Sequence, residues 1–169
     1  TPVVTVADVH PRATIPRAPA PTLDGDLADP VWAQALAFPL QVDNQGQPTR
    51  AEPTTVRALH DGETLWLAFD CAESSPASMK RDHAAERDGL VVYDDRVRVQ
   101  VAHGDQLAWV YVTPDAALWD LTADLSVPAV DKEWNGATAR ALVGDGRWTA
   151  ELGIPLAALG EGAAAGPLR

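Results

Sequence analysis

The chain has 169 residues, about the length of one domain, and carries a formal net charge of −11 from 13 basic and 24 acidic side chains. This charge argues against binding DNA, RNA or an anionic membrane surface, because those phosphate-rich partners attract basic proteins. No run of about 18 apolar residues occurs, so the sequence predicts no membrane-spanning helix. The 14 prolines and 12 glycines, with few long helical patterns, instead favour short strands joined by turns.

The N-terminal part of the chain differs from the rest. Residues 1–22 are rich in proline and are expected to form an extended arm or a linker ahead of one domain over residues 23–169. Asp29 followed by Pro30 fits an N-cap with proline at the first helical position, which predicts a short helix over residues 30–36. Trp32 lies on the apolar side of that helix and is expected to be buried.

Alternation of apolar and polar residues predicts a series of short antiparallel strands. In Arg96–Val101, for example, the three valines are expected to point inward while Arg96, Arg98 and Gln100 point outward. The predicted strands are Thr54–Leu59, Leu65–Asp70, Arg96–Val101, Leu107–Val112, Leu118–Thr122, Thr138–Val143 and Arg147–Ile154. Turn signals such as Asp61-Gly62 separate them. The predicted fold class is therefore all-β, an antiparallel β-sandwich or jelly roll with one or two short helices.

Several short motifs, in this order along the chain, resemble those of the family 9 carbohydrate-binding modules and their DOMON-like relatives. They are Leu23–Trp32, Leu65–Phe69, Arg87–Gly89 with Asp94–Val97, Trp109–Val112, Trp134–Ala137 and Gly146–Leu156. The resemblance covers residues from about 13 to the C-terminus. It implies a β-sandwich that binds carbohydrate as an accessory domain of a larger secreted bacterial protein, in an extracellular or periplasmic location.

The chain departs from the family pattern at three places. Arg98 stands where sugar-binding members commonly carry a glutamate, and the segment Gly89–Tyr93 contains no tryptophan. The family usually has one more strand, which would begin near Gly166, so the sandwich is expected to lack its last strand. These departures favour an alternative, in which the domain kept the sandwich for a structural or interaction role and lost the sugar site.

Proteins recognise a sugar ring by an aromatic face against its C–H groups, with polar side chains around its hydroxyls. Six tryptophans, against two tyrosines and two phenylalanines, favour such a platform. The predicted sugar-contacting residues are Trp134, Trp119, Tyr93, Arg98, Asn135 and Glu151. Arg98 and Glu151 are expected to pair across a polar cleft, or else to form a surface ion pair worth about 0–1 kcal/mol. Core packing is favoured for Trp66, Trp109 and Trp148.

The remaining chemistry gives less specific expectations. Asp94, Asp95 and Glu73 could supply oxygens to structural calcium, although acidic residues of this kind also form turns and caps. No catalytic motif occurs, and the adjacent Asp94 and Asp95 should point to opposite faces of a strand, so no enzyme is predicted. Met79 and His83, four residues apart, leave a haem-binding cytochrome domain as a further alternative. The single cysteine, Cys71, lies in an apolar run and is expected to be buried.

Overall fold

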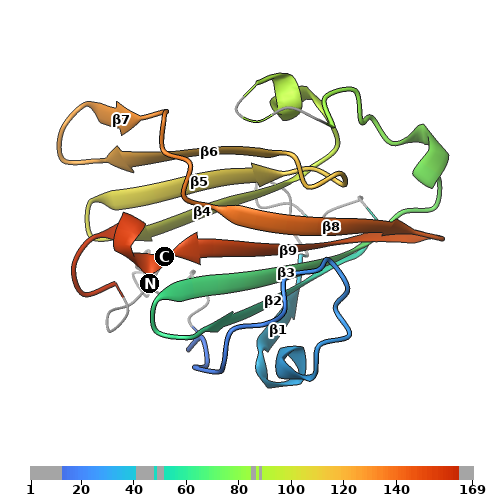
Figure 1. Cartoon of the computed structure of the whole chain (residues 1–169), viewed down its shortest axis with the longest axis horizontal. Helices are drawn as coiled ribbons and strands as arrows, with labels where there is room; N and C mark the ends of the chain where they lie inside the picture. The colour runs from blue at the N-terminus through green and yellow to red at the C-terminus, as the bar shows by residue number, and fades with distance from the viewer. Residues whose placement is uncertain (1–12, 41–47, 49–51, 85–86, 88, 164–169) are drawn as a thin grey trace, which may run out of the picture.

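The computed structural model describes residues 13–40, 48, 52–84, 87 and 89–163. These residues form two antiparallel sheets, with strand orders β1-β2-β3-β9-β8 and β4-β5-β6-β7 (Figure 1). The strands are β1 Leu36–Pro39, β2 Thr54–His60, β3 Thr64–Ala72, β4 Val97–His103, β5 Gln106–Val112, β6 Leu118–Asp124, β7 Ala129–Asp131, β8 Thr138–Gly144 and β9 Arg147–Pro155. The prediction of an all-β antiparallel sandwich is confirmed.

The helical segments in the described part of the chain are short 3-10 helices: η2 Pro30–Gln34, η3 Pro76–Ser78, η4 Leu90–Tyr93 and η5 Leu156–Leu159. The first begins as the sequence predicts, since the Asp29 side chain accepts a hydrogen bond of 3.0 Å from the backbone N–H of Val31. It ends earlier than expected, at Gln34. Among the described residues, no helix combines the length and the apolar character needed to cross a membrane.

The main core fills the space between the inner faces of the two sheets. Leu65, Leu67 and Phe69 of β3 pack with Trp148 and other apolar residues of β9, and valines of β4 and β5 meet them from the opposite sheet. Trp148 is only 6% exposed, which confirms its predicted place in the core. Cys71 also faces this core and is buried.

The N-terminal segment packs on the outer face of the five-stranded sheet. Trp32, Val31 and Ala18 form a second apolar cluster with Leu59 of β2 and Ala68 of β3. Backbone hydrogen bonds join residues 16–18 to the end of β2, where His60 N–H donates to the Pro16 carbonyl and Ala18 N–H donates to the His60 carbonyl, both at 3.0 Å. One outer face of the sandwich is thus occupied by the chain itself. The other, on the four-stranded sheet, carries the candidate site.

Candidate functional site

Three aromatic side chains gather on the outer face of the four-stranded sheet. Alternate residues of β5 (Ala108, Val110 and Val112) face the core, so Trp109 and Tyr111 point away from it. Trp119 of β6 lies directly opposite Tyr111 in the strand register. The ring centroids are 5.1 Å apart for Tyr111–Trp119, 5.7 Å for Trp109–Trp119 and 5.9 Å for Trp109–Tyr111. We call Trp109, Tyr111 and Trp119 the aromatic cluster.

Two arginines from the edge of the same sheet lie over this cluster. The guanidinium carbon of Arg98, on β4, is 5.7 Å from the Trp109 ring centroid, and that of Arg96 is 5.0 Å from the Tyr111 centroid. Arg96 also donates a hydrogen bond of 2.9 Å to the backbone carbonyl of Asp94. Such stacking orients a guanidinium while leaving the N–H groups at its edge free to bind a ligand.

A hollow of about 370 Å³ lies beside the aromatic cluster, lined by Asp94, Asp95, Arg96, Arg98 and Tyr111. This volume is near the lower end of the range for small-molecule sites, about 300–1,000 Å³. Asp95 is exposed, and one of its carboxylate oxygens accepts a hydrogen bond of 2.9 Å from the backbone N–H of Lys80. The hollow therefore offers donors on two guanidiniums and a carboxylate acceptor. Trp119 is outside its lining, is partly exposed and lies against Tyr111.

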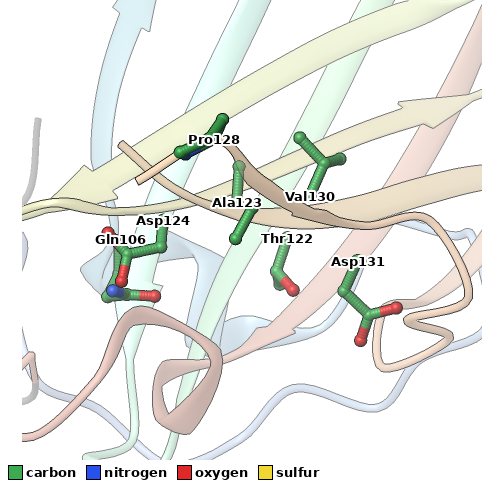
Figure 2. A pocket seen from close by; sticks show the side chains of 8 residues that line it. Gln106, Thr122, Ala123, Asp124, Pro128, Val130 and Asp131 are labelled. Atoms are coloured by element: carbon green, nitrogen blue, oxygen red, sulfur yellow. The ribbon is translucent and has the colours of Figure 1, made fainter. Parts of the chain in front are cut away.

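A second hollow, of about 460 Å³, lies at the turn between β6 and β7. Figure 2 shows Gln106, Thr122, Asp124 and Asp131 pointing to the same side of these strands. Asp124 accepts hydrogen bonds from the hydroxyl and the backbone N–H of Ser126, and these bonds lower the pKa of its carboxyl. The lining contains no aromatic ring, so this hollow lacks the face on which a sugar could stack.

The structure places two of the predicted sugar-contacting residues, Trp119 and Arg98, on the same sheet face. Tyr93, the last residue of η4, directly precedes Asp94 of the hollow and is 63% exposed. The Lys80 ammonium lies 6.0 Å from its ring centroid. It belongs to the segment that leads into the hollow at Asp94. These three residues remain candidates for contact with a ligand.

Trp134 and Asn135 are placed differently from the prediction. Trp134 is half-buried and packs against the main core, with its indole lying over Gly136. A Cβ at Gly136 would be 2.6 Å from carbons of that indole, so the glycine permits this packing. The Asn135 side-chain oxygen accepts a hydrogen bond from Arg87, and its nitrogen donates to the Glu133 carbonyl at 2.9 Å. Both residues thus have structural partners, which argues against the predicted stacking platform at Trp134.

Glu151 is not at the predicted sugar site. It is fully buried on the outer face of the five-stranded sheet, in a different sheet from Arg98. Its carboxylate accepts hydrogen bonds from Trp32 Nε1 at 2.8 Å, from Gly25 N–H at 2.7 Å and from Asp24 N–H at 2.9 Å. The predicted pairing of Arg98 with Glu151 across a cleft is therefore wrong. Glu151 fastens the N-terminal segment to β9.

The structure does not gather the three expected calcium ligands. Within the described residues, no group of three or more His, Cys, Asp or Glu side chains is placed to hold a metal ion. Asp94 is buried beside His83, whose ring Nδ1 is 2.9 Å from one carboxylate oxygen and whose backbone N–H donates to the other at 2.8 Å. Burial alone would raise the pKa of Asp94, but these hydrogen bonds outweigh it and lower the pKa. Glu73 accepts a hydrogen bond from Ser75 instead.

The residues considered for haem ligation have other environments. Met79 is buried in the main core, and the His83 ring is engaged by Asp94. They do not share a helix face, because η3 ends at Ser78. The described structure thus offers no Met–His pair of the kind that the cytochrome alternative needs.

No protein-family model matches the sequence, and comparison with curated proteins found no relative. A solved structure with a similar fold is that of a protein from Bacteroides uniformis ATCC 8492, described as a "putative carbohydrate-binding protein". The two chains superpose with a TM-score of 0.58 at 16% sequence identity, over 75% of this chain and 63% of the other. This likeness establishes a shared fold, and the present chain spans less than two thirds of that protein.

Two members of the aromatic cluster were not among the predicted site residues. The sequence pattern favours core packing for Trp109 and assigns no role to Tyr111. The available signal was the alternation along β5, where the small and branched residues Ala108, Val110 and Val112 form the more consistent core face. That pattern would have directed both rings outward.

Proposed function

We propose that this chain is a non-catalytic sugar-binding domain whose ligand lies on the outer face of β4, β5 and β6. The observation that carries the proposal is the aromatic cluster flanked by Arg96 and Arg98, beside a hollow that is lined by Tyr111 of the cluster and by both arginines. Arginine covers a face of Tyr111 and of Trp109, so Trp119 is the ring on which a sugar would stack. The guanidiniums and the Asp95 carboxylate would then bind its hydroxyls.

The wider context of this function also belongs to the proposal. The motifs that resemble family 9 carbohydrate-binding modules, and the fold shared with a protein described as carbohydrate-binding, both support an accessory glycan-binding role. We propose that the domain serves a larger bacterial protein outside the cytoplasm. Its partner would be a glycan or the end of a polysaccharide, while the net charge of −11 disfavours nucleic acids and anionic membranes.

The decisive experiment is a titration with a panel of neutral and acidic mono- and oligosaccharides, followed by tryptophan fluorescence and by heat. Trp119 is partly exposed, and Trp119→Ala should weaken binding by about 1–3 kcal/mol, the range for an aromatic that dominates a contact. Phe38→Ala is the matched control, because Phe38 is an aromatic that is 40% exposed on β1 of the other sheet. It should bind as the wild type does. Absence of binding across the panel would overturn the proposal.

One observation favours a second candidate, an interaction domain without a sugar site. Leu125, Val127 and Val130, around the turn between β6 and β7, are 60%, 51% and 53% exposed. Exposed apolar groups of this kind mark contact surfaces when they are contiguous. If the domain binds no sugar but associates with itself, and Val130→Lys abolishes that association, the interaction function is the correct one.

A further inference from the structure

The two arginines at the aromatic cluster have no acidic partner within the described ranges. Arg81, Arg87 and Arg147 each form an ion pair with an aspartate, respectively Asp115, Asp120 and Asp70. Arg96 and Arg98, like Arg57 and Arg140, form no ion pair with a described residue, and Arg98 makes no hydrogen bond to one. The hollow that they line also contains Asp95 and the buried Asp94, whose carboxylate is engaged by His83. The Arg96 and Arg98 guanidiniums, each over an aromatic ring and without an ion pair to a described residue, are therefore available to an anionic group of a ligand.

From this we infer that the sugar bound at the aromatic cluster carries a carboxylate, as a uronate does, and that Arg98 binds it. The inference rests on the proposed function and names its ligand class. A planar guanidinium matches a carboxylate with two parallel hydrogen bonds, and such charge-assisted bonds are stronger than those to neutral hydroxyls. Stacking on Trp109 orients the Arg98 guanidinium in advance, which lowers the entropy lost when the ligand binds.

The remaining groups of the hollow limit how much negative charge the ligand can have. Asp95 is exposed in the same hollow, so it would accept hydrogen bonds from sugar hydroxyls and repel a second anionic group. The net charge of the whole chain also repels a polyanion. The site therefore fits a single uronate residue, at a chain end or on a side branch, better than a run of uronates or a sulfated polymer.

The test compares a disaccharide that ends in a hexuronic acid with its methyl ester and with its neutral, carboxyl-reduced counterpart. The wild type should bind the acid about tenfold more tightly than either neutral form. Arg98→Gln should remove this preference and leave binding of the ester in place. Arg98→Lys keeps the charge without the planar fork and should retain part of the preference. Arg140→Gln, at an exposed arginine on β8 of the other sheet, is the control and should keep all of it.

Each other outcome has a distinct meaning, provided that thermal melts show the variants to be folded. Equal binding of the acid, the ester and the neutral sugar would overturn the uronate inference while leaving the proposed function intact. No binding of any sugar would overturn both. A preference for the acid that survives in both Arg98→Gln and Arg98→Lys would overturn the role of Arg98. Tighter binding of a sulfated disaccharide than of the uronate would overturn the assignment of a carboxylate.

Discussion

Replacing Glu151 with alanine would remove the acceptor that joins the N-terminal segment to the five-stranded sheet. The carboxylate is completely buried and accepts three hydrogen bonds, from the indole of Trp32 and from the backbone of Asp24 and Gly25. Because the segment also covers Leu59 and Ala68, loss of this anchor should loosen a whole apolar cluster. We expect Glu151→Ala to be strongly destabilising.

The magnitude follows from the number of donors left without a partner. Two of them, Trp32 Nε1 and Gly25 N–H, meet the carboxylate in a buried setting, whereas Asp24 N–H is only partly buried and can turn to water. A buried donor without an acceptor costs about 1–3 kcal/mol, so two cost about 2–6 kcal/mol. Glu151→Gln keeps one acceptor oxygen but points its amide N–H₂ group at the remaining N–H donors. Its loss of stability should be roughly half that of Glu151→Ala.

The assay is urea unfolding followed by far-ultraviolet circular dichroism, which reports mainly on the backbone and depends less on individual tryptophans than fluorescence does. Trp32→Phe is the matched partner variant, since it removes one indole N–H while keeping an aromatic ring. It should cost about 1 kcal/mol in hydrogen bonding, beyond any loss from its smaller ring. The double variant should then lose less than the sum of the two single changes, because both act on the same hydrogen bond.

Two results would refute this reasoning. A loss of less than about 1 kcal/mol in Glu151→Ala would mean that the buried donors find other acceptors at little cost. A Glu151→Gln variant with unchanged stability and weakened sugar binding would restore the sugar contact predicted from the sequence. The titration of the proposed function, run on this variant, separates the two cases.

Two further predictions concern buried titratable groups. The pKa of Asp94 is lowered in the folded state. The ionised carboxylate therefore stabilises the fold above about pH 4, and this stabilisation is lost as the pH falls below that value. Asp94→Asn should thus reduce the urea midpoint more at pH 7 than at pH 3. An equal reduction at both pH values would contradict this. Burial raises the pKa of the Cys71 thiol to about 11, so a thiol reagent at pH 8 should react with it slowly in the native protein and quickly in urea. Rapid modification of the native protein would show that Cys71 is accessible.

Local patterns in the sequence predicted most strands correctly because each pattern depends on residues close together in the chain. The alternation from Val97 to Val101 matches β4, and the Asp61-Gly62 turn joins β2 to β3 as expected. Asp29 and Pro30 likewise start a helical turn where predicted. β1 and β7 were missed because they have four and three residues, too few for a period of two to be distinct.

Contacts between residues far apart in the sequence were harder to predict. Alternation shows which face of a strand a side chain is on, but not the sheet to which the strand belongs. Arg98 and Glu151 each point away from the main core, and this alone allowed them to be placed in one cleft. The strand orders put them in separate sheets instead. Trp134 shows the same limit: its neighbours in sequence are polar, but its indole lies over Gly136, which leaves room for it, and packs against the core.

The separation of the two sheets also restricts where a ligand can bind. The outer face of the five-stranded sheet is occupied by residues 16–34, and displacing them would break the hydrogen bonds to Glu151 and expose Trp32. At about 25 cal/mol for each Å² of apolar surface, together with the buried hydrogen bonds, that cost would exceed what a weak sugar contact returns. The outer face of β4, β5 and β6 needs no such opening, since Trp119, Arg96 and Arg98 already reach solvent. A sugar that binds this domain should therefore leave the hydrogen bonds to Glu151 intact. Substitutions on the outer face of β4, β5 and β6 should change binding, and substitutions around Glu151 should change stability.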